Sequence, residues 1–529
     1  MAYCSRECQE DGWNKGHRMV CARVCDTIDN VDLDRTVFVL GQQMKTYTGK
    51  ITTTLASMQK LYRFGRILGA GAFGVVFAAT SVAAPAVSVA VKFQFTAANN
   101  VHSNDIVNDA ASEAGAQRFI TTLFVDSGSS MRTVCPVVKL FDRGVVTFTG
   151  GTSAEVLAAL GLPAPTTASD IEKYDDLMKR FIPSAQTYFV NVAVMELVPG
   201  GSLRRYLGTK PASARTMAAF LLQLLCTLMM LNEVVLLTHF DLHDDNVFVK
   251  DLVVDARPVV LRYTVASDTT FLIPAEACDN KLLVIGDFGM CYMNYMDART
   301  PAAPRVRIMN RRFRSSDKNF VENDMASSTT YNPTHDLQKI GSSLYMAFTY
   351  QQLYGTFEML PITRVLLAMM VLPFGDTTKM QIAQWPVLAE AAQSMTTKIA
   401  VLAEAINEYI RRGGLPTAAA LAVFKDTHEG LLEALDVFGN SAVLFVPGLS
   451  ETPRTILRRY GETLRGIVGY GVRLDGARVI DLSLTVGDGG SPSSEVLYPA
   501  AALSPPPVAV PVAVSVAVPK RATRQKKNA

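Results

Sequence analysis

The feature that most constrains the fold is a glycine-rich run flanked on both sides by strand-like sequence. Residues 62–80 read YRFGRILGAGAFGVVFAAT, and residues 87–95 read VSVAVKFQF. Short runs of β-branched and aromatic residues around a loop of small residues predict an antiparallel hairpin followed by a third strand. A dinucleotide-binding loop requires a helix directly after its glycines. The strand that follows here therefore excludes that class of site.

The remaining sequence divides into a strand-rich part and a helix-rich part. Residues 104–124 predict a helix, and residues 135–148 and 187–198 predict two further strands. After Pro199-Gly200-Gly201 the pattern is mainly helical to about residue 470. Strands followed by helices predict an α+β fold with a β-rich N-lobe and an α-helical C-lobe. The predicted organisation is a head at 1–25, a connector at 26–58, the N-lobe at 59–198 with an insert at about 150–186 and a short helix inside it, the C-lobe at 199–486 and a tail at 487–529.

Composition limits the functional classes. Hydrophobic residues make up 49% of the 529 residues, and the formal net charge is only +3, which argues against a chain built mainly to hold nucleic acid. Four of the eight cysteines lie in the first 25 residues, and the polar N-terminus carries no signal peptide, so we expect an intracellular, cytoplasmic or nuclear protein. The apolar stretch 217–237 approaches the length of a membrane span. Gln223, Asn232 and Glu233 interrupt it, which favours a buried core helix and no membrane partner.

The glycine run and the strand after it suit polyphosphate binding. Gly69, Gly71 and Gly74 form a G-x-G-x-x-G pattern that lets backbone N–H groups approach phosphate oxygens. Lys92, in VAVK, lies on the next strand within reach of the same phosphates, although an edge-strand lysine facing water is the alternative. Glu113 on the predicted helix is expected to pair with Lys92. Asp109 is its rival one turn earlier, and either residue could be a surface carboxylate.

Two motifs in the helical half supply further groups for phosphate chemistry. Residues 239–246 read HFDLHDDN and residues 284–289 read VIGDFG. Asp241 can accept the proton of an attacking hydroxyl, and Asn246 can ligate a metal ion. Asp287 follows a short strand and suits Mg²⁺ that bridges the β- and γ-phosphates.

Together these four motifs resemble those of the protein-kinase superfamily in order and approximate spacing, over about residues 59–480. The resemblance implies a bilobal kinase fold, ATP and Mg²⁺ as cofactors, and transfer of the γ-phosphate to a protein Ser or Thr hydroxyl. It also implies a buried aspartate, Asp336, after the activation segment. The residues assigned to catalysis are Asp241, Lys92, Glu113 and His239; those assigned to ATP are Gly69, Gly71, Gly74, Val76, Ala90, Lys92, the gatekeeper Met195 and the hinge from Glu196 to Val198; those assigned to Mg²⁺ are Asn246 and Asp287.

Three departures from the family pattern bear on substrate and regulation. Phe240 replaces the arginine that pairs with a phosphorylated activation loop, so we expect activity without that switch. His243 stands where protein kinases carry a lysine. With histidine there, the segment H-x-D-L-H-x-x-N resembles that of aminoglycoside and choline kinases. The A-P-E motif is absent, and Tyr331-Asn332-Pro333 is its candidate substitute. A small-molecule phosphotransferase and a non-catalytic kinase-fold scaffold therefore stand as alternatives, and the long insert and low-complexity tail resemble kinases of large DNA viruses, for which a host-cell or virion location is expected.

Basic residues concentrate in two places. Arginines in the predicted activation segment suit an acidic substrate or nucleic acid, with a solvated loop as the plainer interpretation; they are Arg305, Arg307, Arg311, Arg312 and Arg314. The Pro-, Ala- and Val-rich tail predicts no packed structure and ends in a basic cluster suited to a nuclear import signal or to a solubilising terminus.

The head predicts a metal site. Cys4, Cys8, His17 and Cys21 follow the pattern C-x3-C…H-x3-C, which supplies four ligands for tetrahedral Zn²⁺. The run resembles the second half of a MYND-type zinc finger, and that resemblance implies a proline-rich peptide as partner. A degenerate N-terminus with free thiols is the alternative.

Overall fold

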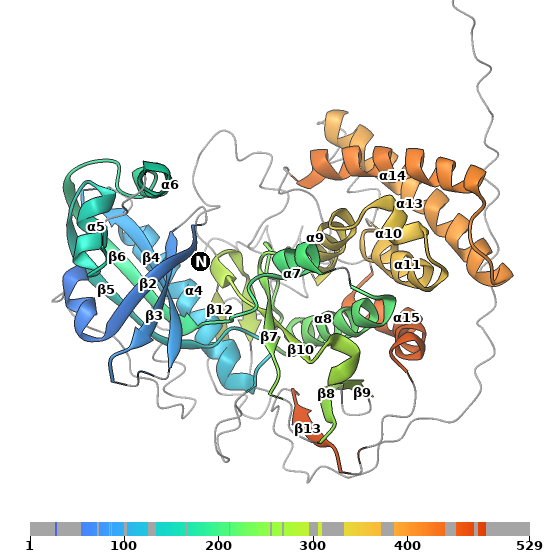
Figure 1. The fold of residues 1–529 in the computed structure, drawn as a ribbon, viewed down its shortest axis with the longest axis horizontal. Coiled ribbons are helices and arrows are strands. Elements are labelled where there is room, and N and C mark those ends of the chain that lie inside the picture. Colours follow the sequence, from blue (N-terminus) through green and yellow to red (C-terminus); the bar gives the residue numbers. More distant parts are fainter. Residues whose placement is uncertain are drawn as a thin grey trace, which may run out of the picture. The chain divides into compact units, whose positions relative to one another are not determined.

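A five-stranded antiparallel sheet forms the N-terminal part of the chain in the computed structural model (Figure 1). Its strand order is β2-β3-β4-β6-β5, and every neighbouring pair is antiparallel. The predicted hairpin and third strand are confirmed, whereas β5 begins five residues later than the predicted strand at 135. The bounds are Tyr62–Ala70 for β2, Val75–Ser81 for β3, Ser88–Ala97 for β4, Leu140–Gly150 for β5 and Gln186–Glu196 for β6.

The structure describes most of the chain between residues 54 and 482. The head at 1–25 and the tail at 487–529 lie outside the described residues. The described residues are 27–28, 54–70, 74–83, 85, 87–99, 103–124, 134–163, 168–210, 212–253, 257–266, 269–295, 305–308, 333–371, 386–439, 451–469, 474 and 476–482.

Both faces of this sheet are covered. The helix α4 (Ser103–Phe124) packs on one face, as the pattern at 104–124 predicts. The insert supplies α5 (Ser153–Ala159) and α6 (Ala168–Lys179), whose apolar side chains join a core with the strands and with the 3₁₀ helix Leu55–Lys60. The predicted short helix is α5. It begins there because Thr152 and Glu155 form a capping box that satisfies the first free N–H groups.

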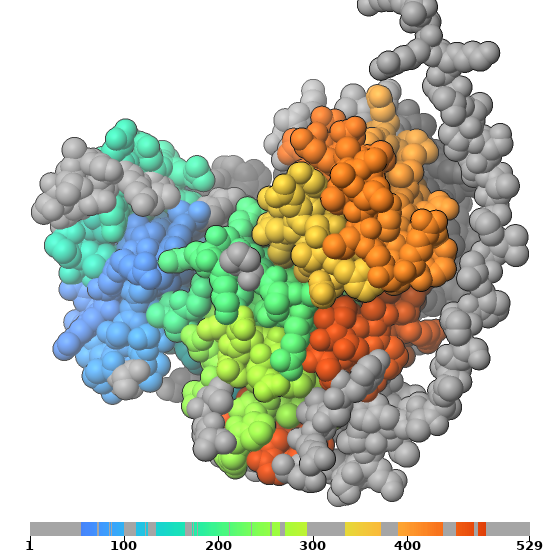
Figure 2. Space-filling view, turned by 45° about the vertical axis from the view of Figure 1, so that its right-hand side comes forward, coloured from blue at the N-terminus to red at the C-terminus, as the bar shows by residue number. Residues whose placement is uncertain are grey.

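The C-terminal part of the described chain is mainly helical. The helix α8 is its centre: α8 packs along α15, and Figure 2 shows α13 and α14 in orange above α15 in red. Residues 214–233 of α8 are long and apolar enough to span a membrane, but 89% of the tested window is buried within the fold, which agrees with a core helix. The helices are α7 Leu203–Thr209, α8 Ala214–Val234, α9 Pro333–Met346, α10 Tyr350–Tyr354, α11 Leu360–Met369, α13 Pro386–Arg412, α14 Ala418–Gly439 and α15 Pro453–Val468.

Small sheets interrupt these helices, and of their strands only β10, before Asp287, was predicted from the sequence. The strands β7 and β10 pair antiparallel, and β8 lies between β9 and the parallel strand β13. The chain is thus mixed α+β, with strands concentrated in its N-terminal part and helices in its C-terminal part. The remaining elements are β1 Thr27–Ile28, β7 Val247–Asp251, β8 Val259–Ala266, β9 Thr269–Pro274, β10 Lys281–Ile285, β11 Met293–Tyr295, β12 Arg305–Ile308 and β13 Arg478–Asp481, with 3₁₀ helices at Ala275–Cys278, Phe288–Met290 and Phe357–Met359.

Candidate active site

Three charged residues from distant parts of the sequence meet beside the sheet. Lys92 Nζ on β4 lies 2.6 Å from Glu113 Oε1 on α4 and 3.0 Å from Asp287 Oδ1 after β10. Strand pairing places Lys92 opposite Val76 on β3, next to the glycine run. The expected Lys92–Glu113 pair is therefore present, and it also includes Asp287. The side chain of the rival Asp109 lies outside the described residues.

The charges in this cluster stabilise one another. Burial by itself would lower the pKa of Lys92, but the carboxylates of Asp287 and Glu113 raise it above its ordinary value, so the ammonium stays charged. Burial would likewise raise the pKa of Asp287. Attraction to Lys92 and its hydrogen bond outweigh that effect and lower the pKa to about 2. A buried ammonium with an adjacent carboxylate open to solvent is suited to a polyanion bound with a divalent cation.

The segment 239–246 forms a loop that brings Asp241 and Asn246 together. Asn246 Nδ2 donates to the Asp241 carbonyl oxygen at 2.8 Å and lies 3.4 Å from Asp241 Oδ2. Since the amide nitrogen is used in this contact, the side-chain oxygen of Asn246 is the atom suited to a metal ion. Gly286 N donates to the Asn246 carbonyl at 3.0 Å, which places Asn246 beside the strand end that carries Asp287.

A buried aspartate on α9 holds this loop from behind. Asp336, which is 0% exposed, accepts hydrogen bonds from the backbone N–H groups of His239 at 2.6 Å and Phe240 at 2.9 Å. Phe240 has a φ of 63°, and Asp287 has a φ of 61°. Left-handed backbone at non-glycine residues costs about 1 kcal/mol or more. The contacts to Asp336 fix the first of these conformations.

His239 connects the loop to the segment around Asp287. Its Nε2 lies 2.9 Å from the Gly286 carbonyl oxygen, and its ring packs 5.1 Å from that of Phe288. A carbonyl only accepts, so Nε2 carries the proton in this tautomer. His239 is 1% exposed. It therefore positions the site and does not face a substrate.

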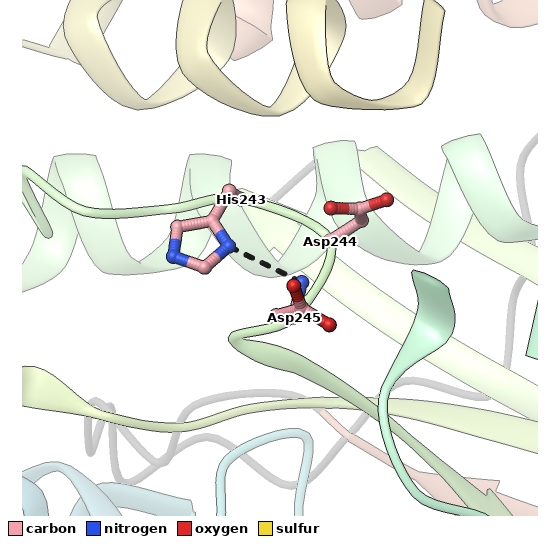
Figure 3. Close-up of side chains that lie close together, drawn as sticks. All are labelled: His243, Asp244 and Asp245. Atoms are coloured by element: carbon pink, nitrogen blue, oxygen red, sulfur yellow. Dashed lines mark hydrogen bonds between the residues drawn. The ribbon is translucent and has the colours of Figure 1, made fainter. Parts of the chain in front are cut away.

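A cluster of side chains that could hold a metal ion lies between Leu242 and Asn246. Its members are His243, Asp244 and Asp245 (Figure 3). The Asp244 carboxylate already has a protein donor, because Ser343 Oγ donates to it at 2.5 Å. Arg204 also pairs with Asp244 at 2.9 Å. Because protein donors already satisfy Asp244, these contacts favour a structural role. His243 Nε2 lies 3.8 Å from Asp241 Oδ1, so His243 borders the proposed base.

The glycine run is described at both ends, whereas Gly71 lies outside the described residues. Gly69 pairs with Val76 across the hairpin, and a Cβ at Gly74 would overlap the Phe93 carbonyl oxygen. Glycine is thus required at residue 74 for close approach of β3 to β4. Ala90 lies opposite Met195, so both residues fall on the strands that lead away from Lys92 toward the end of β6.

The end of β6 joins the two parts of the described chain. Glu196 is its last residue, and its backbone N–H donates to the Lys139 carbonyl at 2.8 Å. Its carboxylate pairs with Lys250 of β7. This side chain therefore links β6 to β7, the strand that follows the loop at 239–246, a contact that the predicted hinge role did not include. Val198, two residues on, is buried at 8% exposure.

The contacts that support these groups were not predicted from the sequence. Gln94 Nε2 donates to Glu113 Oε2 at 3.1 Å, and Arg204 joins the loop through Asp244. The only signal for Gln94 was its spacing of two from Lys92, which puts both side chains on one face of a strand. The predicted zinc ligands Cys4, Cys8, His17 and Cys21 lie outside the described residues.

The described cysteines are not candidates for catalysis. All four are buried free thiols, and burial raises the pKa of Cys135 and of Cys278 to about 12. A thiol in that state carries almost no thiolate at neutral pH. Among the described cysteines, none has the properties of a nucleophile.

Comparison with known proteins gives no family. No family model matches the chain, and no curated protein matches it significantly.

Proposed function

We propose that this chain is an ATP- and Mg²⁺-dependent phosphotransferase of the protein-kinase type, acting on a Ser or Thr hydroxyl of a protein. The observation that carries the proposal is the convergence of Lys92 with Glu113 and Asp287 beside the Asp241–Asn246 loop. Residues separated by up to 195 positions supply one cation and several carboxylates in the arrangement that phosphoryl transfer requires. The four motif resemblances add to this, and they cover both lobes.

The residues fit the proposed cofactors by charge and by atom type. Lys92 would contact the α- and β-phosphates, and the backbone of residues 69–74 would cover them. Asp287 and the side-chain oxygen of Asn246 are hard oxygen ligands of the type that Mg²⁺ prefers. Mg²⁺ held by these residues would supply positive charge to offset the charge that develops on the phosphate oxygens. The apolar side chains of Val76, Ala90 and Val198 would contact the adenine.

In the proposed reaction Asp241 acts as the base. The acceptor hydroxyl gives its proton to Asp241, its oxygen forms a bond to the γ-phosphorus, and the bond from that phosphorus to the leaving ADP breaks. The Asp241 side chain is 39% exposed, which leaves it open to an acceptor. The contact from Asn246 orients its carboxylate.

A small-molecule acceptor is the second candidate, and His243 is the observation that favours it. Where protein kinases carry a lysine, His243 places an imidazole 3.8 Å from Asp241. Imidazole is a fixed charge only when protonated. A weaker charge near the γ-phosphate is compatible with the active-site loop of the aminoglycoside and choline kinases that this segment resembles.

The test measures transfer and binding separately. The full chain is incubated with γ-labelled ATP and Mg²⁺ and offered a mixture of proteins, an aminoglycoside and choline. We expect the wild type to place label on protein Ser or Thr. Asp241→Asn should transfer at least about 100-fold less, because a general base contributes to the chemical step. The Kd of Asp241→Asn for MgATP should stay within about threefold of wild type, since the base is not needed for binding. Asp251→Asn is the matched control. It removes the same charge from a 64% exposed side chain on β7 and should transfer like wild type.

The outcomes separate the candidates. Label on the small molecules alone would favour the second candidate. Equal transfer by wild type and Asp241→Asn would refute the assignment of the base. Failure of the wild type to bind MgATP would overturn the proposed function as a whole.

A further inference from the structure

One side chain beside the Lys92–Glu113 pair has no assigned role. Gln94 lies on β4 two residues after Lys92, and it is 6% exposed. Its Nε2 donates to Glu113 Oε2 at 3.1 Å, while Lys92 contacts Oε1 of the same carboxylate at 2.6 Å. Both oxygens of Glu113 are therefore held by donors from one strand. We propose that Gln94 is a positioning residue for this pair: by fixing Glu113 it holds Lys92 where ATP phosphates bind.

The geometry follows from strand and helix periodicity. Side chains at i and i+2 of a strand point to the same face, so Lys92 and Gln94 both face α4. Residues three to four apart share a face of a helix, so Gln117 lies one turn beyond Glu113 on the side toward the sheet. Gln117 Nε2 donates to the Val138 carbonyl at 2.8 Å. Two amides thus fix the rotation of α4 at the level of the ion pair.

The burial of these groups gives the contact its strength. Lys92 is 9% exposed, and Glu113 is 7% exposed. A hydrogen bond to a buried charged group stabilises by more than one between neutral groups, and loss of one partner leaves the charge with an unmet contact. Without Gln94, Glu113 Oε2 would lose the donor that β4 supplies to it, and the carboxylate could rotate away from Lys92.

A purely structural explanation is that Gln94 needs Glu113 only to satisfy its own amide. Thr96 allows a comparison on the same face. It is 2% exposed on the same side of β4, and its hydroxyl makes no hydrogen bond to Glu113. Thr96→Val also supplies a matched control, because it removes a buried polar atom from the same face and leaves Glu113 untouched.

The inference rests on the proposed function, and the test separates the two. The affinity of the full chain for a fluorescent ATP analogue with Mg²⁺ is measured for wild type, Gln94→Met and Thr96→Val. Methionine keeps the length of glutamine without a donor, and a cavity of about 50 Å³ beside Gln94 gives it room. We expect Gln94→Met to bind about tenfold more weakly, from the loss of one charged hydrogen bond, and Thr96→Val to bind like wild type.

A double-mutant cycle distinguishes positioning from loss of packing. If Gln94 acts through Glu113, Gln94→Met adds nothing to the weakening already caused by Glu113→Gln. Full additivity in the double variant would overturn the inference, as would a Gln94→Met protein that binds like Thr96→Val. Should Gln94→Met not fold, Gln94→Asn, whose amide is too short to reach Glu113, is expected to show the same weakening. Absence of nucleotide binding by wild type would overturn both this inference and the proposed function.

Discussion

The hydrogen bonds between Asp336 and the loop at 239–246, called the clamp below, permit a quantitative test. Asp336→Asn keeps the shape of the side chain but replaces one carboxylate oxygen by an NH₂ group. The carboxylate now accepts two backbone N–H groups, at 2.6 Å and 2.9 Å. Each hydrogen bond to a charged group contributes about 1.5–3 kcal/mol. Asparagine retains one weaker bond and directs a donor at the second N–H.

Part of this loss is offset because asparagine, unlike aspartate, does not bury a negative charge. Asp336 is 0% exposed, so its neutral replacement has a smaller desolvation cost. Loss of about 3–4 kcal/mol of hydrogen bonding against relief of about 1–2 kcal/mol leaves a net destabilisation of about 2 kcal/mol. The left-handed backbone of Phe240 (φ 63°) is strained, so the loop would relax once the hydrogen bonds to Asp336 are weakened. Under the proposed function, a shift of Asp241 by about 1 Å would reduce phosphate transfer about 100-fold.

Urea-induced unfolding of the full chain, followed by circular dichroism, measures the loss of stability in Asp336→Asn through the midpoint and slope of the transition. Glu358→Gln is the matched control, because it removes one negative charge from an exposed side chain of the helical part and should change stability by less than about 0.5 kcal/mol. If the midpoint of Asp336→Asn coincides with that control, the clamp does not stabilise the fold. If the midpoint falls and transfer is unchanged, the clamp is structural and does not position the base.

Two further predictions use other contacts. Because attraction to Lys92 lowers the pKa of Asp287 to about 2, its carboxylate stabilises the folded state fully above the unfolded pKa near 4 and loses that effect as pH falls toward 2. The free energies of unfolding of wild type and Asp287→Asn, from urea titrations, should differ by about 1 kcal/mol at pH 7 after discount for a 41% exposed side chain. The gap should narrow toward pH 3, and a constant gap would contradict this reasoning. Gly200→Ala should destabilise by about 1–3 kcal/mol, since its Cβ would overlap the Val249 carbonyl oxygen, whereas Gly414→Ala meets no atom within 4 Å and should be neutral by the same unfolding measurement.

The parts of the site that sequence could predict are those whose role depends on local backbone. Lys92 needs only a strand, and Asp241 and Asn246 need only a loop that closes within five residues. Asp287 needs the end of β10. Each of these was identified from motif spacing. Their convergence follows from strand pairing between distant segments, which the spacing implies only through the family resemblance.

Gln94 shows why the supporting residues were missed. Alternation along β4 puts Val91, Phe93 and their neighbours on one face and Lys92 with Gln94 on the other. A polar residue at alternate positions ordinarily indicates the solvent face of a strand. Here the insert helices cover the apolar face and α4 covers the polar one, so both are buried. Polarity along the strand cannot by itself distinguish a solvated amide from one that holds a carboxylate.

The small sheet of β8, β9 and β13 was missed for a different reason. Residues 259–266, VVLRYTVA, carry a clear strand pattern, but they lie between helical segments and their partner β13 follows more than 200 residues later. Arg262 and Asp481 pair across this junction. Local propensity favours a strand here, and the mainly helical interpretation of residues 199–470 gave it too little weight.

The loop around Phe240 is supported by contacts that do not involve the side chain of this residue. The loop is held by backbone N–H groups that donate to Asp336, and such contacts do not depend on the side chain at 240. The Phe240 ring packs 5.0 Å from that of His335, next to the clamp. Phenylalanine here, where the protein kinases that the sequence resembles carry arginine, therefore leaves the supports of Asp241 in place. This separation is what the prediction of activity without a phosphorylated activation segment requires: the geometry of the base and the charge that senses a phosphate reside in different atoms.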